Sequence, residues 1–436
     1  MRLSLPAVLL AGCTAALLLQ PLASVTFASV TSTATASTAT ASTATADPPG
    51  ARRRTAAGDG STTSLPLTAG NGLAPRTTRP FELLGVDWDG PAAAMDGAVV
   101  RVRTRDAATG RWSEWHTLET DAEDGPDRAP HGATAPLWTG RSDGVAVELR
   151  PGPSGAPPGL RLELVDPGGG AAAGPSVRTL PADPAPTGPT PTGPAPTGPA
   201  PTGPVPTGPA PTGPAPTGPG TTGPGPVDPA PVVVHQAPRP AIVTRAGWGA
   251  DESLREKTFE YTGPVREVFV HHTATATGYA CSDAPRVVRA IYQYHVQTNG
   301  WRDIGYNFLV DRCGTIYEGR AGGVGQPVHG AHTLGFNTDS SGVAAIGTYV
   351  KDAPPQAMLD ALAALAAWKL GLTGRPADGR TRLTSGSDAS RYPKGTVVDF
   401  DAVSGHRDAF RTECPGAALY ARLPDLRTAA ARRQPR

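Results

Sequence analysis

The sequence is poor in cysteine and in net charge. Its 436 residues include four cysteines, Cys13, Cys281, Cys313 and Cys414, and the net charge is +1. Because nucleic-acid binding needs a concentration of basic side chains, this balance argues against a nucleic acid as partner. Beyond the N-terminus the chain lacks an apolar run long enough to span a bilayer, so we expect no stable membrane insertion of the mature protein.

The one long apolar run begins after Arg2 and extends to about Leu22. A basic residue, an apolar stretch and then small residues form the pattern of a secretory signal peptide, which we assign to residues 1–30. The LAGC run that ends at Cys13 also resembles a lipoprotein signal, and lipid anchoring at Cys13 is the minor alternative. We therefore expect the mature chain to be secreted.

Cysteine parity then becomes informative. Without Cys13, three cysteines remain, and three cannot all pair with one another. In an oxidising compartment an unpaired thiol calls for an explanation, and metal binding is a good one. Cys414 is the strongest candidate for the odd thiol, because the run GHRDAFRTECPG places His406 eight residues before it.

Glycine and proline are abundant, with 53 and 49 residues. Much of the excess lies in PTGPA-like repeats, which dominate a predicted linker over residues 181–234. Proline removes backbone donors, and glycine and threonine offer no apolar face, so we expect an extended spacer that reaches on the order of 100 Å. Residues 31–74 begin with a stretch rich in Ser, Thr and Ala and are predicted to be disordered.

Residues 75–180 show the period-two alternation of β-strands. Apolar and charged residues alternate over residues 100–104, 145–150 and 160–164, which predicts a small antiparallel all-β domain with one solvated face. The tryptophans of this region have two interpretations: a carbohydrate-stacking surface, or a core filled by at least two of the three, Trp88, Trp112 and Trp115. We favour the core.

After His235 the pattern changes to that of an α/β domain, predicted over residues 235–425 and followed by a basic tail, residues 426–436. Strands are predicted over residues 265–270, 306–311, 342–350 and 397–400, and helices over residues 285–298 and 356–370. Mixed strands and helices favour a mixed central β-sheet with flanking helices. The length of the chain agrees with two domains.

Three side chains of this second domain could bind one zinc ion. They are His271 at the end of a strand, His406 after the last strand, and Cys414. Two imidazoles and a thiolate leave a fourth position open, as in catalytic zinc sites. A nucleophilic Cys–His pair is the alternative. Pro415 directly follows Cys414 in a segment with little helical signal, which argues against activation of the thiol by a helix dipole.

A series of motifs resembles the peptidoglycan recognition protein family, which is itself similar to the amidase-type phage lysozymes. The motifs occur in order between residues 245 and 420: RAGWGA (245–250), FVHHTAT (269–275), DIGYNFLVD (303–311), YEGR (317–320), GAHT (330–333) and GHRDAFRTECPG (405–416). Each motif is weak alone, and six in the same order are specific.

The resemblance implies a zinc-dependent N-acetylmuramoyl-L-alanine amidase, which cuts the amide between N-acetylmuramic acid and L-alanine of peptidoglycan. It implies His271, His406 and Cys414 as ligands of Zn2+ and Tyr306 and Thr412 as catalytic residues. Binding-only relatives often carry serine at the cysteine position, so Cys414 favours an enzyme. The partner would be peptidoglycan, and we expect a monomer associated with the cell wall.

The resemblance also implies substrate contacts and a disulfide. The substrate-binding candidates are His332, Arg320 and Asn337. Many family members continue YEGR with Gly-Trp, which is linked to stem-peptide choice, whereas this chain reads Ala-Gly-Gly, so no stem-peptide preference is implied. Cys281 and Cys313 would close a loop of about thirty residues, worth roughly 3 kcal/mol; two reduced thiols are the alternative.

Three functions therefore stay open at this point. The first is a secreted zinc amidase, the second is a peptidoglycan-binding protein without activity, and the third is a cysteine hydrolase that uses Cys414. The β-domain could in addition bind the wall polymer.

Overall fold

The computed structural model describes residues 52–55, 60–68, 70, 72–120, 125–126, 131–168, 179–180, 182 and 235–435. All of these residues belong to one compact unit, Thr45–Arg436. The predicted signal peptide and nearly all of the predicted linker lie outside the described residues. Within the described ranges, none of the helices has both the length and the apolar character needed to cross a membrane.

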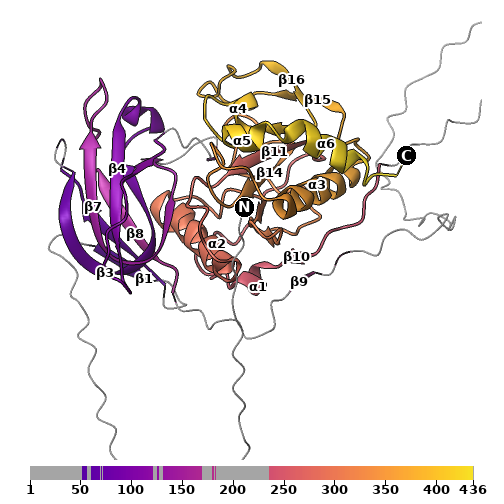
Figure 1. Ribbon diagram of the computed structural model, residues 1–436. Helices are drawn as coiled ribbons and strands as arrows, with labels where there is room; N and C mark the ends of the chain where they lie inside the picture. The colour runs from indigo at the N-terminus through magenta and orange to yellow at the C-terminus, as the bar shows by residue number, and fades with distance from the viewer. Residues whose placement is uncertain are drawn as a thin grey trace, which may run out of the picture. The chain divides into compact units, whose positions relative to one another are not determined.

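The N-terminal part forms an eight-stranded antiparallel sheet, drawn in indigo to magenta in Figure 1. Its order is β1 (Arg52–Thr55), β2 (Ser61–Pro66), β8 (Arg161–Asp166), β3 (Leu73–Trp88), β7 (Leu137–Arg150), β4 (Val99–Asp106) and β5 (His116–Leu118), with β6 (Gly132–Ala133) paired to β3. The expected domain start at residue 75 is too late, since β2 pairs with β8 from Ser61 onward. Strand β2 reads STTSLP, and one large apolar residue is too few for a period-two signal.

The alternation in β4 has the predicted consequence. Val100 and Val102 are fully buried, while Arg101 and Arg103 lie on the other face. Trp88 is also fully buried in this core, and its indole N–H donates to the carbonyl of Pro91 at 2.9 Å.

The other two tryptophans lie outside that core. Trp112 is 36% exposed, and the guanidinium of Arg103 stacks on the rings of both Trp112 and Trp115 at 5.1 and 4.9 Å. The prediction that at least two tryptophans fill the core is therefore wrong. A neighbouring arginine supplies the contact surface that the core does not.

The alternation predicted that the opposite face of the sheet is exposed to solvent. Part of that face is buried instead. Leu83 of β3 and Val165 of β8 are fully buried in a cluster with Val287 and Ile291 of helix α2 (Ala284–Gln293). Part of this face therefore packs against the C-terminal domain. Helix α2 continues as a π-helical turn, η3 (Tyr294–Thr298), over the range predicted as one helix.

The C-terminal domain is built on a seven-stranded mixed sheet, which confirms the predicted fold class. Strands β17 (Val403–Gly405), β11 (Glu267–His272), β14 (Ser340–Ala345) and β12 (Phe308–Val310) run parallel. The sheet continues with β13 (Ile316–Glu318), β10 (Ile242–Val243) and β9 (Thr179–Leu180). All six residues of β11 are buried, as is typical of a strand covered on both faces. A separate hairpin pairs β15 (Arg380–Thr384) with β16 (Val397–Asp401).

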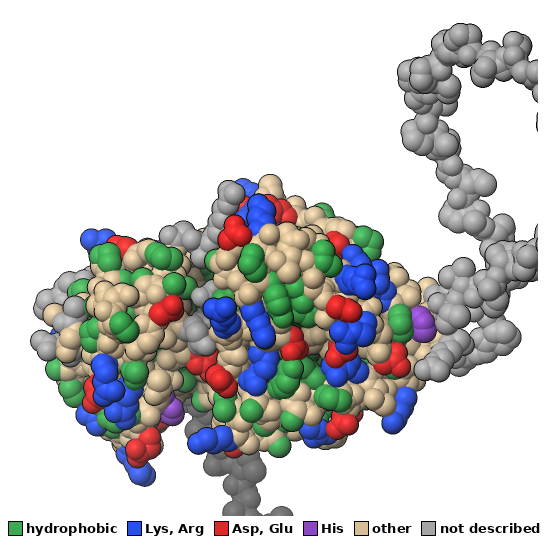
Figure 2. Space-filling model, turned by 90° about the horizontal axis from the view of Figure 1, so that it is seen from above, with side chains coloured by type: hydrophobic (Ala, Val, Ile, Leu, Met, Phe, Trp, Pro, Cys, Tyr) green, Lys and Arg blue, Asp and Glu red, His purple; other side chains and the backbone are tan. Residues whose placement is uncertain are grey.

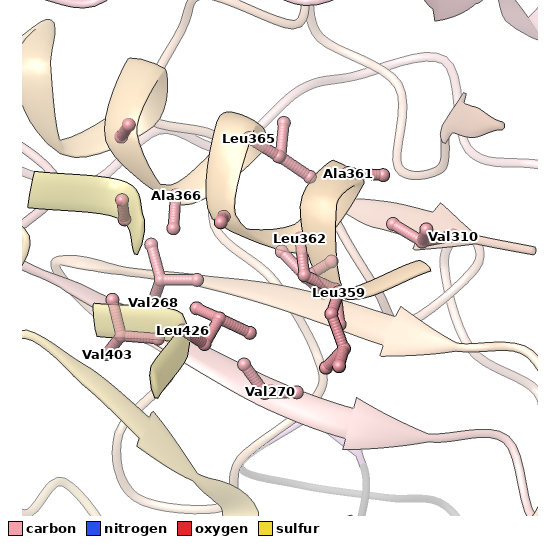
Figure 3. Close-up of a cluster of buried hydrophobic side chains, with 14 of the residues drawn as sticks. Val268, Val270, Val310, Leu359, Ala361, Leu362, Leu365, Ala366, Val403 and Leu426 are labelled. Atoms are coloured by element: carbon pink, nitrogen blue, oxygen red, sulfur yellow. The ribbon is translucent and has the colours of Figure 1, made fainter. Parts of the chain in front are cut away.

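Helix α3 (Gln356–Gly371) covers one face of this sheet. Figure 3 shows Leu362 and Leu359 of the helix above Val268 and Val270 of β11 and near Val310 of β12. The helix is apolar nearly all round because it lies between the sheet and another helix. Short helices α1 (Arg245–Trp248), α4 (His406–Ala409) and α5 (Ala417–Tyr420) complete the domain.

The predicted basic tail is in fact a packed helix, α6 (Leu423–Ala431), which lies beside α3 in Figure 1. Leu426 and Ala430, one helical turn apart, are buried in the same core as α3. Gln434 accepts from the backbone N–H of Ala377 at 2.8 Å. On the face shown in Figure 2, basic side chains lie among acidic ones, in keeping with the small net charge.

Candidate metal centre and active site

Two neighbouring strands bring the two predicted imidazole ligands together. His271 lies in β11, and β17 pairs with β11 through Val270 and Gly405. His406 follows directly as the first residue of α4. The strand before His406 is thus β17, whereas the predicted strand over residues 397–400 corresponds to β16 of the separate hairpin.

The predicted ligand atoms converge. One donor atom each from His271, His406 and Cys414 lies within 4.8 Å of the others, and all three residues are buried. The thiol Sγ is 3.8 Å from Nδ1 of His271, and the two imidazole centroids are 4.6 Å apart. Ligand atoms of a tetrahedral zinc site are roughly 3.5 Å apart, so this buried donor set fits Zn2+. Among the described cysteines, Cys414 is the one outside a disulfide.

A chain of hydrogen bonds orients the first imidazole. Nε2 of His271 is 3.3 Å from the hydroxyl oxygen of Thr333, which is 3.0 Å from Nδ1 of His332. If Nε2 donates to Thr333, the lone pair of His271 is on Nδ1, the atom that faces Cys414. The backbone N–H of His272 donates to the Cys414 sulfur at 3.3 Å, which stabilises a thiolate.

The centre borders a cavity that also contains both predicted catalytic residues. Tyr306 and Thr412 line it together with His406 and Cys414. The Tyr306 ring lies 5.5 Å from that of His271, and the Thr412 hydroxyl accepts from the backbone N–H of Cys414 at 3.1 Å. The structure therefore brings both predicted residues to the cavity that borders the donor set.

The three predicted substrate contacts are not at the cavity surface. His332 is fully buried behind His271, with ring centroids 5.2 Å apart. Asn337 is 1% exposed, and its carbonyl oxygen accepts from the backbone N–H groups of His332 and Thr333. Arg320 lines a different pocket, and burial lowers the pKa of its guanidinium. Their contact with substrate stays a prediction, and Asn337 has a visible role in shaping the loop.

The sequence did not predict that residues of the N-terminal domain line the cavity, and Glu119 is one of them. Glu119, which follows β5 of the N-terminal sheet, has its carboxylate 3.3 Å from Nε2 of His272. Nothing in the local sequence signals this contact, because the two residues are 153 positions apart.

The disulfide implied by the resemblance is present. Cys281 and Cys313 are bonded, with a Cα–Cα distance of 6.2 Å. The bond joins the turn after β12 to the short 3-10 helix η2 (Cys281–Asp283) that precedes α2.

Two family models match the chain. The model described as N-acetylmuramoyl-L-alanine amidase matches residues 261–417. The model described as Rv3811 N-terminal galactose-binding domain-like matches residues 30–192. The second match agrees with an all-β domain before the amidase-like one.

Known proteins match the C-terminal domain. The human N-acetylmuramoyl-L-alanine amidase is 36% identical over 185 residues, 42% of this chain, and the match spans 27% of the human protein. Peptidoglycan-recognition protein LB of Drosophila melanogaster is 31% identical over 183 residues, 42% of this chain and 67% of that protein. The solved structure of wild-type Drosophila PGRP-LB is 31% identical, covers 42% of this chain and 91% of its own, and has a TM-score of 0.33. On its sequence, the chain belongs to the peptidoglycan recognition protein family, which includes peptidoglycan amidases and binding proteins.

Proposed function

We propose that the chain is a secreted, zinc-dependent N-acetylmuramoyl-L-alanine amidase that hydrolyses the amide between N-acetylmuramic acid and L-alanine of peptidoglycan. The observation that carries the proposal is the convergence of His271, His406 and Cys414 beside a cavity lined by Tyr306 and Thr412. A binding protein would need the cavity but not three converging donors that include a thiol.

The metal-binding side chains and the two hydroxyl groups have different roles in the proposed reaction. His271, His406 and Cys414 would hold the ion, which when bound supplies Lewis acidity and lowers the pKa of water toward about 7. The hydroxyl groups of Tyr306 and Thr412 are donors that can orient the amide and stabilise negative charge on its oxygen. Neither hydroxyl is a good base at its ordinary pKa, so we assign both a positioning and hydrogen-bonding role.

The test is metal analysis of the purified full-length protein together with mass spectrometry of digested muropeptides. We expect one zinc per chain and release of peptides with free N-terminal alanine, abolished by a chelator and restored by zinc. The Cys414→Ser variant should lose both zinc and cleavage while it keeps its secondary structure. A Thr348→Val variant, outside the cavity, serves as the matched control.

The competing functions give different results in the same experiment. A binding protein would retain muropeptides without releasing alanine-terminated peptides at any zinc concentration. A cysteine hydrolase would cleave in the presence of chelator and would be inhibited by alkylation of Cys414.

Export and wall association belong to the same proposal. The signal-peptide pattern before residue 30 and the linker composition support them. N-terminal sequencing of the mature protein tests export: a start shortly after residue 22 supports a cleaved signal peptide, and a lipid-modified Cys13 supports the alternative.

A further inference from the structure

The N-terminal β-domain is packed against the C-terminal domain by a buried apolar interface. Leu83, Trp138 and Val165 from the sheet belong to one cluster with Ile291 and Tyr294 from α2 and η3. All are at most 5% exposed. An interface of this kind resembles a domain core more than a transient contact, so the two domains are expected to act as one body.

Close approach at Gly85 defines this interface further. A Cβ atom added to Gly85 would lie 2.1 Å from the hydroxyl oxygen of Tyr294. The same hydroxyl donates to the carbonyl of Thr134 at 3.1 Å. Arg286 of α2 forms an ion pair with Glu82, whose side chain is 3% exposed. The β-domain is thus held by apolar packing, a buried hydrogen bond and a buried carboxylate that would be costly to expose or leave unpaired.

The edge of the β-domain reaches the cavity beside the donor set. Glu119, Thr134, Ala135 and Pro136 form one side of it, and Tyr306 and Thr412 contribute to the remainder. Glu119 contacts His272, the residue that directly follows the ligand candidate His271 in the sequence. The carbonyl of Gly125 also accepts from the side-chain amide of Asn337 at 3.0 Å, in the loop behind the centre.

These contacts limit the size of the ligand. Both domains line the cavity, with Glu119, Thr134, Ala135 and Pro136 of the β-domain facing residues of the amidase domain. A muramic acid inside a long glycan strand has sugar neighbours on both sides, and these need an open groove. To provide that groove the β-domain would have to move away, exposing Leu83 and Val165 and separating Glu82 from Arg286.

We infer that the β-domain is a wall of the amidase cleft and restricts the substrate to short, soluble muropeptides, so that internal positions of long glycan strands are excluded. This inference rests on the proposed amidase function. Glu119 of the β-domain contacts His272 of the amidase domain at the cavity, and the hydroxyl of Tyr294 lies so close to Gly85 that a larger side chain there would collide with it.

The test compares two soluble ligands with the full-length protein. One is a disaccharide–peptide monomer, and the other is an uncross-linked glycan chain with the same peptide on every muramic acid. We expect the zinc-loaded protein to cleave the monomer at least about tenfold faster per bond, which corresponds to about 1.4 kcal/mol. Calorimetry on the chelated protein should show the same preference in affinity, a readout that does not need activity.

Two variants should widen the cleft on the side of the β-domain, each in a different way. Gly85→Ala should push β3 away from Tyr294, and Glu119→Ala should remove the side chain at the cavity; both should bring the two rates per bond closer together. Thr117→Ala, an exposed position two residues before Glu119, is the matched control and should keep the preference. Because Gly85→Ala could unfold the protein, Glu119→Ala keeps the test decisive.

The outcomes separate this inference from the function on which it rests. Equal rates per bond in the wild-type protein would contradict the restriction of substrate size by the β-domain, while the amidase function would still be supported. A preference that neither variant reduces would also contradict that restriction. If neither ligand is cleaved or bound, the proposed function is wrong and the inference falls with it.

Discussion

Thr333 is the residue whose substitution tests the geometry of the metal centre most directly. Its side chain is fully buried, and its hydroxyl oxygen lies 3.3 Å from Nε2 of His271 and 3.0 Å from Nδ1 of His332. Thr333→Val keeps the shape of the side chain and removes the hydroxyl group. His271 then loses the partner that holds its Nδ1 toward Cys414.

The expected size of the effect follows from these distances. Removal of a group that orients a metal-bound histidine costs about 10- to 100-fold in metal affinity. Since the contact to His271 is long for a hydrogen bond, we expect the lower end, a loss of about tenfold or about 1.4 kcal/mol. The lost hydrogen bond to Nδ1 of His332 should also lower the free energy of unfolding by about 1 kcal/mol.

Zinc affinity is measured on the purified full-length protein by competition with a chromophoric chelator, and unfolding by urea titration of the chelated protein. Thr373→Val is the matched control, because its hydroxyl donates to the carbonyls of Val265 and Leu370 and does not line the cavity. If folded Thr333→Val protein binds zinc as tightly as the wild type, the hydroxyl does not orient His271 and the hydrogen-bond chain has no role in the centre.

Three further predictions follow from single contacts. Tyr306→Phe should retain zinc while kcat for muropeptide cleavage falls about 10²-fold, because one cavity-lining donor is lost; an unchanged kcat would remove Tyr306 from the catalytic set. Leu362→Ala should lower the free energy of unfolding by about 2–5 kcal/mol in urea titrations, because it leaves a cavity between α3 and the sheet; a cost below that of an exposed substitution would contradict the packing in Figure 3. Burial raises the pKa of the Glu267 carboxyl well above its ordinary value, so the stability that its protonated form contributes is complete below about pH 4.3 and is lost as the pH rises through the raised pKa. Glu267→Gln should therefore be more stable than the wild type at neutral pH and should flatten the decline, and parallel pH profiles of unfolding for the two proteins would refute this.

The sequence predicted the fold of each domain better than it predicted the contact between the two domains. A period-two pattern states that one face of a strand is apolar, but it does not identify what covers the other face. In β8, RLELVD, the core residues Leu162 and Leu164 are obvious, while Glu163 on the opposite face indicates water. Val165 on that same face is instead buried against α2, and Glu163 is 6% exposed. Because of the single charged residue Glu163, the sequence predicted a solvent-exposed face where the structure has an interface.

Charged residues also explain why the C-terminal helix was predicted as a basic tail. Residues 426–436 include four arginines, which indicate a solvated tail. Leu423, Leu426 and Ala430 nevertheless occur at i, i+3 and i+7, the spacing of one helix face, and all three are buried. Charged side chains on the other faces of a short helix do not weaken such a stripe.

The site could be predicted from the order of its motifs and not from the physics of any one of them. His271 and Cys414 are 143 positions apart, and they meet because β17 pairs in parallel with β11 and delivers His406 and the segment after it to the same sheet end. A parallel pairing between strands so distant in sequence leaves no local signal, and here the predicted strand before His406 was assigned to the wrong segment. The grouping of His271, His406 and Cys414 was predicted despite that error, because six ordered motifs specify which side chains belong together without specifying how the strands bring them there. Glu119 belongs to no such motif, which is why its contact with His272 at the cavity became visible only in the structure.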